Sequence, residues 1–315
     1  IHLKHRRFYS MLCSEVLEQF LKEKKVNGLT DDTLMHYRLH IQRFIKYVNN
    51  CDIKDVSYSK YQDYIIYCKT KKAEGSKSNK NVKLASRTIK TYASAVRTFL
   101  QYCYDFNYIN DDIASNITTP RYQKKVITIL NDDELKQIIK SFDTTTFVGI
   151  RNLFIFSIML DCGLRLSEVT KLKYKDFDFN NGLIKINGKG QKQRYVPFSV
   201  TLKETFDLYV EACKSLSNKY LTSSLFRTIE DENISKNTIS LMFKRISQKL
   251  GIDVHPHLVR HTFATKFLIN GGDLESLRLI LGHTTYYMVL QYLHFVNTLY
   301  IKNQSKYSPL SKIKD

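Results

Sequence analysis

The chain is long and strongly basic, and both properties narrow what it can be. Its 315 residues exceed the usual size of one compact domain, so two domains joined by a short linker are expected. Forty-nine Lys and Arg residues against thirty Asp and Glu leave a formal charge of +19, an excess that favours nucleic acid as the partner. A basic surface without a dedicated ligand is the alternative at this point.

Cysteine spacing and apolar runs exclude further classes. The six cysteines form neither a CxxC pair nor a Cys/His cluster with zinc spacing, so we expect no metal site, no disulfide framework and a location in the reducing cytoplasm. No apolar run reaches the roughly 18 residues that a membrane span needs, and the start, IHLKHRRFYSML, lacks the apolar core of a secretion signal. No membrane partner is therefore expected.

The first part of the chain, from about Tyr9 to Asn116, has the pattern of a small helical bundle. In two stretches apolar residues recur every three or four positions and so share one helix face. The first set is Tyr37, Ile41, Phe44, Ile45 and Val48, and the second is Ile89, Tyr92, Val96, Phe99, Leu100 and Cys103. Ser86 is a candidate N-cap of the second helix, and the polar run 75–86 is typical of a loop.

The polar side of that second helix carries a row of side chains suited to DNA. Lys90 and Arg97 are cations that can contact phosphates, while Ser94 and Gln101 can hydrogen-bond base edges. We therefore predict that this row lies against DNA, with an ordinary solvated face as the alternative.

A linker is expected in the run TTPRYQKKV, residues 118–126. The run combines a proline with a basic cluster and has no periodicity. We therefore predict a helical DNA-binding domain of residues 1–118, a linker of 119–128, and a second domain of 129–315.

The second domain combines helices with one β-hairpin. Asn131 or Asp132 can cap its first helix, and an apolar helix through Met159 and Leu160 breaks at Gly163. Alternation in LIKIN (183–187), the turn GKGQK, and RYVPF (194–198) predict the hairpin.

Two further helices end at glycines. The first is stopped by Gly271 and Gly272, and the second is capped by Asp273 and stopped by Gly282. The fold class expected for the whole chain is mostly α with a small antiparallel β-sheet.

Two arginines are suited to phosphate chemistry. The negative charge of a phosphoryl transition state must be met by metal ions or by fixed cations, and the planar arginine fork can give two hydrogen bonds to phosphate oxygens. Arg165 follows the break at Gly163, at a helix start whose backbone N–H groups also favour an anion. Arg260 lies within HLVRHTFAT.

Several motifs, in order, resemble those of the tyrosine recombinases, also called phage integrases. CGLRLSEVTKL resembles the first arginine motif of that family, NGKGQKQRYVPF its lysine hairpin, HLVRHTFAT its His-x-x-Arg motif, and LGHTT its final histidine motif, while QYLH supplies the tyrosine. The resemblance covers 129–295. The helical first part is similar in size and position to the core-binding, SAM-like domain of the family, and a mixed α/β catalytic domain is implied for the rest.

The resemblance implies a role for each motif residue. Arg165 and Arg260 would clamp the scissile phosphate, and His257 would assist proton movement and phosphate contact. Lys189 would protonate the departing 5′ oxygen, with Lys192 as its rival for that role. His283 would donate a hydrogen bond to a phosphate oxygen, with a simple helix-end partner as the alternative.

Tyr292 is the nucleophile that the resemblance implies. A phenol attacks poorly at its ordinary pKa near 10, so it needs a cationic pocket. Tyr286 and Tyr287 follow His283 too closely, whereas Tyr300 and Tyr307 fall beyond the match. Val289 and Leu293 stand where polar residues would be expected.

Glu168 is a supporting candidate. It lies one helical turn beyond Arg165 and could orient a pocket cation through an ion pair, with an ordinary surface carboxylate as the alternative.

The function implied is that of a site-specific recombinase or integrase. It would form a 3′-phosphotyrosyl bond, need no metal or cofactor, and exchange strands through a Holliday junction. Its partners would be double-stranded DNA recombination sites, held by a homotetramer on two duplexes. The tail from Val296 to Asp315 would dock on a neighbouring protomer, with a locally packed C-terminus as the alternative.

Three other functions are considered. One is a catalytically inactive DNA-binding protein on the same scaffold. A metal-dependent transposase would explain neither the paired arginine motifs nor the terminal tyrosine. A relaxing topoisomerase would act without a defined site. Transposon movement, phage integration and resolution of replicon multimers stay open as natural roles.

Overall fold

Two hydrophobic cores organise the chain. The computed structural model describes residues 10–70, 83–119, 128–188, 193–216, 224–230, 232–293 and 313. The chain divides into the units Ile1–Lys125 and Val126–Asp315, and each unit has its own core. The linker expected at 119–128 stays a prediction, because residues 120–127 lie outside the described part.

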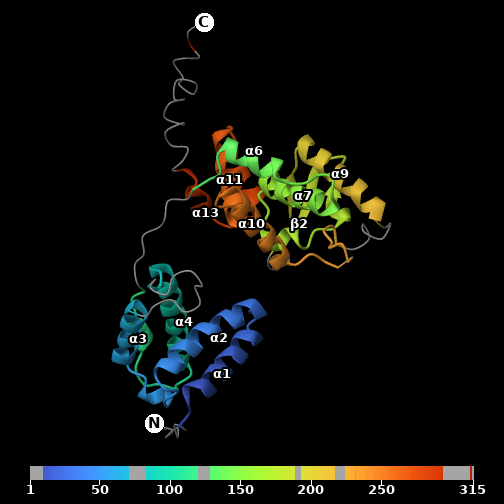
Figure 1. Ribbon diagram of the computed structural model, residues 1–315. Helices are drawn as coiled ribbons and strands as arrows, with labels where there is room; N and C mark the ends of the chain where they lie inside the picture. The colour runs from blue at the N-terminus through green and yellow to red at the C-terminus, as the bar shows by residue number, and fades with distance from the viewer. Residues whose placement is uncertain are drawn as a thin grey trace. The chain divides into compact units, whose positions relative to one another are not determined.

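The first unit is helical within its described residues (Figure 1). Its elements are α1 (Cys13–Val26), α2 (Asp31–Tyr47), the 3-10 turn η1 (Ile53–Asp55), α3 (Tyr58–Thr70), α4 (Ser86–Asp105) and α5 (Ile113–Asn116). Both predicted apolar stripes face the core, and Phe20, Phe44 and Phe99 are fully buried in it. The prediction of Ser86 as an N-cap is wrong by one residue. Ala85 takes that place, because its backbone carbonyl accepts the N–H groups of Thr88 and Ile89.

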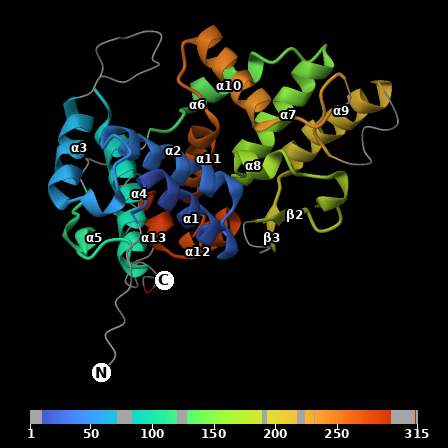
Figure 2. The same cartoon turned by 90° about the horizontal axis from the view of Figure 1, so that it is seen from below.

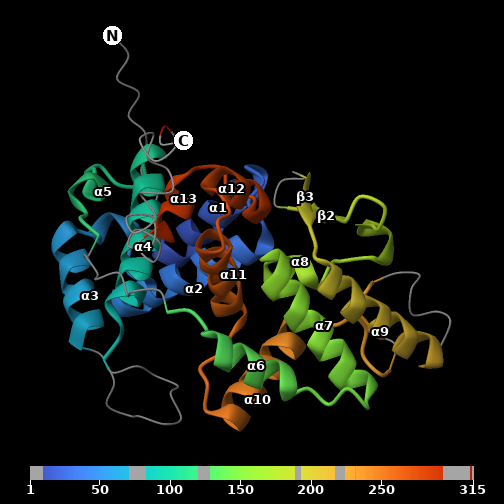
Figure 3. The ribbon, with the colours of Figure 1, turned by 90° about the horizontal axis from the view of Figure 1, so that it is seen from above.

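The second unit is built around a buried helix, α7 (Phe147–Cys162), which packs against α9 (Val200–Leu216) and α11 (Pro256–Ile269). Apolar residues on every side explain its central place (Figure 3). The other elements are α6 (Asp132–Lys140), α8 (Leu166–Val169), η2 (Tyr174–Asp176), β1 (Phe177–Asp178), β2 (Leu183–Asn187), β3 (Gln193–Pro197), α10 (Lys236–Leu250), α12 (Leu274–Leu281) and α13 (Tyr287–Leu290).

A three-stranded antiparallel sheet lies beside these helices in the order β1-β2-β3. Ile184 pairs with Val196 and Ile186 with Arg194, so the predicted hairpin is confirmed. Strand β1 was not predicted, because two residues carry no alternation that a sequence pattern can detect. Figure 2 shows α8 next to this hairpin. The observed class, mostly helical with a small antiparallel sheet, is the predicted one.

Several predicted helix ends of the second unit are also confirmed. Asn131 caps α6 with a reciprocal bond to Glu134, and Asp273 caps α12. Gly163 and Gly282 end α7 and α12 in the left-handed conformation, which glycine adopts at the lowest cost. Among the described residues, no helix combines the length and apolar character that a bilayer crossing requires.

Candidate active site

Arg260 is the structural centre of the site. It lies on α11 with 6% of its surface exposed, and its guanidinium donates to the carbonyl of Gly163 and, at 2.8 Å, to that of Leu281. These carbonyls belong to the C-terminal ends of α7 and α12, where the partial negative charge of a helix favours a cation. Burial and the charge of Arg165 together lower the pKa of Arg260 to about 10, yet the side chain stays protonated at neutral pH.

His283 contacts the same guanidinium. Its backbone N–H ends α12 by donating to Arg278, while its ring Nε2 lies 3.2 Å from Nη2 of Arg260. A guanidinium can only donate, so Nε2 must accept and the ring proton must sit on Nδ1. Within the described residues this buried Nδ1 has no hydrogen-bond partner. In this tautomer the Nδ1 proton is buried beside Arg260 without a partner, and burial and the nearby arginines lower the pKa of the ring to about 4.

Glu168 joins two arginines. It is 7% exposed, and its carboxylate accepts from the Arg165 guanidinium at 3.0 Å and from both terminal nitrogens of Arg194 at 2.8 and 2.9 Å. Burial alone would raise the pKa of Glu168, but the Arg194 hydrogen bonds and the arginine charges outweigh it and leave the pKa below its usual value. The alternative of an ordinary surface carboxylate is therefore wrong.

The backbone at Arg165 binds an anion that belongs to the chain itself. Arg165 caps the N-terminus of α8, and its backbone N–H donates to Glu168 at 2.8 Å. This donor, expected to favour an anion, is occupied by the carboxylate of Glu168. The guanidinium of Arg165 is about a third exposed and remains accessible beside that ion pair.

Arg194 was missed by the sequence analysis. It pairs with Ile186 across the hairpin and shares the inward face of β3 with the buried Val196. Besides Glu168, it donates to the carbonyl of Ile280 at 2.7 Å. An arginine in register with buried strand residues was the signal that could have identified it.

Tyr292 lies just after α13 and is 1% exposed. Its hydroxyl oxygen lies 2.9 Å from Nδ1 of His261. Burial raises the pKa of Tyr292, while the charges of Arg260 and Arg165 act in the opposite direction and place the phenol within their field. His261 was also missed, although it directly follows Arg260 in HLVRH, one helical turn beyond His257.

His257 and Lys189 are the remaining two predicted pocket residues. His257 lies in the first turn of α11 and is exposed, and partial desolvation, His255 and Arg260 lower its pKa. Lys189, like its rival Lys192, lies outside the described residues. The structure thus brings together Arg165, Glu168, Arg260, His283 and Tyr292, all within the second unit.

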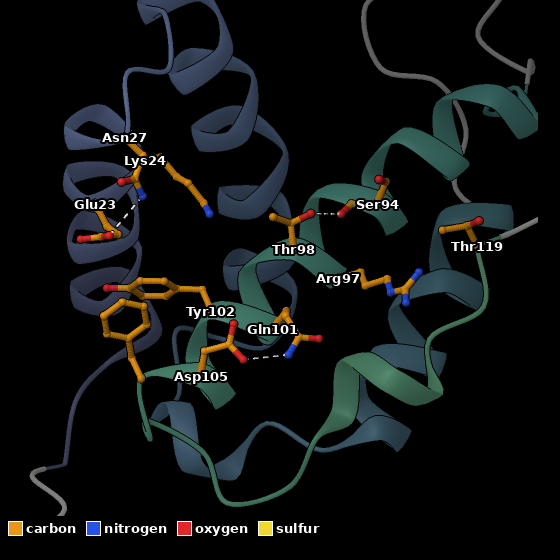
Figure 4. Close-up of a pocket in the computed structure, with 11 residues that line it drawn as sticks. Glu23, Lys24, Asn27, Ser94, Arg97, Thr98, Gln101, Tyr102, Asp105 and Thr119 are labelled. Carbon is orange, nitrogen blue, oxygen red and sulfur yellow. Dashed lines mark hydrogen bonds between the residues drawn. The ribbon is translucent and has the colours of Figure 1, made fainter. Parts of the chain in front are cut away.

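The row on α4 lines two neighbouring hollows of the first unit. Ser94, Arg97 and Gln101 border a cavity of about 420 Å³, facing Lys24 of α1 and Asn27, which caps the C-terminus of that helix (Figure 4). Lys90 and Ser94 border a second cavity of about 320 Å³. Gln101 donates to Asp105 at 2.9 Å, and Arg97 to the carbonyl of Ala114 at 3.2 Å. The four residues therefore share one side of α4, as their spacing predicts.

The part of the chain that the structure describes contains no group of three His, Cys, Asp or Glu side chains placed as metal ligands.

Known proteins resemble this chain over nearly its full length. The sequence pattern of the phage integrase family matches residues 128–298, and that of the phage integrase SAM-like domain matches 13–119. The tyrosine recombinase XerD of Staphylococcus haemolyticus is 26% identical over 298 residues, which cover 93% of this chain and 98% of that protein. The tyrosine recombinase XerC of Lactobacillus delbrueckii subsp. bulgaricus is 35% identical over 205 residues, or 64% of this chain and 70% of that protein.

A solved structure gives the same picture for the fold. The integrase of the transposon Tn1549, in complex with circular intermediate DNA, matches with a TM-score of 0.72 at 18% identity. The match covers 90% of this chain and 95% of that integrase chain. At this identity the likeness concerns the fold alone. The family match over more than half of the chain, joined to the order of its motifs, identifies the chain as a member of the phage integrase family, the tyrosine recombinases that catalyse site-specific DNA strand exchange.

Proposed function

We propose that this recombinase cleaves DNA by attack of the Tyr292 hydroxyl on a phosphate, forming a 3′-phosphotyrosyl bond and releasing a 5′ hydroxyl. The observation that carries the proposal is a buried phenol within the field of two pocket arginines, Arg260 and Arg165. Fixed cations of this kind stabilise the charge that develops on the transferred phosphoryl group. Because the phosphotyrosyl bond keeps the bond energy, a 5′ hydroxyl from a second duplex can reverse the attack.

Each of the other pocket residues receives a role in this proposal. Arg165 and Arg260 hold the nonbridging oxygens, and the free Nδ1–H of His283 donates to one of them. His257 contacts the phosphate from the first turn of α11 and assists proton movement. Lys189 protonates the departing 5′ oxygen. Glu168 is a positioning residue that holds Arg165 through the 3.0 Å ion pair.

Double-stranded DNA carrying recombination sites is the partner that we propose. A DNA complex is named for the Tn1549 integrase, whose fold this chain shares. We assign residues 1–118 to the core-binding domain, 119–128 to a linker and 129–315 to the catalytic domain. Lys90, Ser94, Arg97 and Gln101 on α4 would contact the duplex.

Strand exchange between two duplexes requires several copies of the chain. We propose a homotetramer that passes through a Holliday junction, with the tail 296–315 docking on a neighbouring protomer. Of that tail only Ile313 is among the described residues. The relatives named above are bacterial, and bacterial DNA lies in the cytoplasm, so we place the activity there, on a mobile element or on the chromosome.

A trapping experiment tests the nucleophile. A target is first selected from a random-sequence DNA pool by binding to the Tyr292→Phe variant, and is then built into a nicked suicide duplex. With a chelator present, the parent protein should form covalent DNA adducts and Tyr292→Phe should form none. Tyr287→Phe is the matched control, because Tyr287 is 70% exposed and precedes Tyr292 by five residues.

Each contrary result favours a different function. Equal adducts from Tyr292→Phe would place the nucleophile elsewhere. Binding without adducts from the parent would favour the inactive DNA-binding protein, and cleavage that chelator abolishes would favour a metal-dependent transposase. Relaxation of supercoiled DNA without a selected site would favour a topoisomerase.

A further inference from the structure

His261 touches the reacting atom of the proposed nucleophile, although no motif role was assigned to it. Its Nδ1 lies 2.9 Å from the Tyr292 oxygen, within normal hydrogen-bond distance, and the two ring centroids are 5.6 Å apart. His261 lies in the middle of α11, next to Arg260, so the helix fixes its position. A group so placed is within reach of the proton that Tyr292 must lose.

The surroundings of His261 keep it neutral. Burial, together with the nearby His257, Arg260 and His255, lowers its pKa to about 4. A neutral imidazole carries one nitrogen lone pair, and in the tautomer with the proton on Nε2 this lone pair is on Nδ1. Nδ1 then accepts a hydrogen bond from the phenol O–H.

We propose that His261 is a catalytic residue that accepts the proton of Tyr292 through Nδ1 as the tyrosine oxygen attacks phosphorus. The inference rests on the proposed function of Tyr292. The O–H bond of Tyr292 breaks as an N–H bond forms on His261, and the new O–P bond forms as the bond from phosphorus to the 5′ oxygen breaks. That oxygen takes its proton from Lys189. In rejoining, the imidazolium returns its proton to the tyrosine oxygen.

The cationic surroundings make this proton transfer depend on DNA. Without DNA, a protonated His261 would lie beside Arg260 and near His257, which is unfavourable, so the phenol keeps its proton. A bound phosphate brings negative charge to the same cations and thereby raises the basicity of His261. The nucleophile is consequently activated only when a phosphate occupies the pocket.

His257 is a weaker candidate for the same step. It lies one turn earlier on α11, and its side chain is exposed, whereas that of His261 is half-buried. The hydrogen bond to the Tyr292 oxygen is made by His261. We therefore keep His257 for contact with the phosphate and assign the proton of Tyr292 to His261.

The variants His261→Gln and His261→Ala separate proton transfer from positioning. Glutamine can hydrogen-bond the phenol but cannot take its proton. Loss of a general base lowers a rate by about 10²–10⁴-fold, so single-turnover cleavage of the suicide duplex should fall by at least about 100-fold in both variants. Added imidazole should partly restore cleavage by His261→Ala. Near-parental cleavage by His261→Gln would show a positioning role and overturn the proposal.

A second substrate shows whether His261 acts on the Tyr292 oxygen or on the departing 5′ oxygen. A duplex with sulfur in place of the bridging 5′ oxygen has a leaving group that needs no proton. It should restore cleavage by Lys189→Ala but leave His261→Ala slow, and rescue of His261→Ala would overturn the proposal. Parental adduct formation through Tyr292, measured in the same assay, tests the proposed function separately. Retained binding of the selected duplex and an unchanged circular dichroism spectrum show that the His261 variants are folded.

Discussion

At the scale of single residues, one buried carboxylate offsets part of the positive charge of the pocket and leaves a net cationic site. Glu168 holds Arg194 with two hydrogen bonds and Arg165 with a third. Two cations without their counterion in a desolvated pocket would repel each other, and burial would penalise each of them. Glu168 therefore contributes to the fold of the second unit as well as to the placement of Arg165.

Replacement of Glu168 by Ala should be strongly destabilising. Removal of one partner from a buried ion pair costs about 3–5 kcal/mol, whereas an exposed pair is worth under about 1 kcal/mol. The chain contains a matched control in Glu18, which also receives two hydrogen bonds from one arginine, Arg38, but is 57% exposed. Hydrogen exchange followed by mass spectrometry resolves the two units separately and should show a large loss of protection for Glu168→Ala and little for Glu18→Ala. Similar small losses would mean that the buried pair contributes no more than a surface pair.

The contribution of Glu168 should also depend on pH. Its pKa in the folded chain lies below the usual 4.5, so the unfolded chain takes up a proton first as the pH falls. The stabilisation is therefore fully present above about pH 4.5 and is lost as the pH falls through the folded pKa. Urea unfolding followed by circular dichroism measures the free energy of unfolding at each pH. The difference in this free energy between the parent and Glu168→Ala should become smaller below about pH 4.5. A constant difference at all pH values would show that packing, not charge, carries the effect.

Candidate site residues could be singled out from the sequence where a residue type and a motif coincided. Glu168 was singled out because it lies one turn after an arginine, and His283 because LGHTT resembles the final histidine motif of the family. Arg194 and His261 were missed because their importance comes from contacts across the fold, to Glu168 and Tyr292 respectively. Such contacts leave no local pattern beyond an arginine on an inward strand face.

At the scale of elements, helix ends build the pocket. Gly163 ends α7, which directs the chain into Arg165, and its carbonyl accepts from Arg260. Gly282 ends α12, directly before His283. The Arg260 guanidinium thus connects the C-terminal ends of two helices that are far apart in the sequence.

Gly163→Ala should disturb both the packing and the chemistry. Gly163 has a φ of 60°, and an added Cβ would lie 2.3 Å from the ring of Phe263. The left-handed conformation costs alanine about 1–2 kcal/mol, and overpacking adds about 1–3 kcal/mol. Gly251, with a φ of 69° and open space around it, is the control that carries the conformational cost alone.

Two measurements check this comparison. Thermal unfolding should show a larger loss of stability for Gly163→Ala than for Gly251→Ala, and only the former should reduce adduct formation on the suicide duplex. Equal losses of stability with unchanged cleavage would mean that the turn after α7 does not position the pocket.

Element types were predictable because their signals are local. Apolar periodicity, the cap at Asn131 and the stops at Gly163 and Gly282 each depend on a few adjacent residues. The two-residue strand β1 forms only because β2 lies beside it, so its own sequence does not reveal it. The cap of α4 is a backbone carbonyl of Ala85, for which side-chain chemistry gives no indication.

At the scale of the whole molecule, the excess of positive charge should govern affinity for DNA. A formal charge of +19 is distributed over a chain with two separate cores. Each lysine or arginine that neutralises a phosphate releases condensed counterions, so affinity falls steeply as salt rises. The number of such contacts can therefore be counted from the salt dependence, without knowledge of how the two units are arranged.

Substitutions in the α4 row should reduce that salt dependence in defined steps. Lys90→Gln and Arg97→Gln should each weaken binding to selected and unrelated duplexes alike, and each should reduce the slope of log affinity against log salt by about 0.9. Lys214→Gln on α9 is the control, because Lys214 already lies 3.6 Å from Glu211 and belongs to the second unit. Fluorescence anisotropy with a labelled duplex at several salt concentrations measures all three slopes. An equal reduction of the slope by Lys214→Gln would show that the positive charge acts diffusely and that the α4 row is an ordinary solvated face. A reduction confined to the Lys90 and Arg97 variants would place this side of α4 on the DNA backbone.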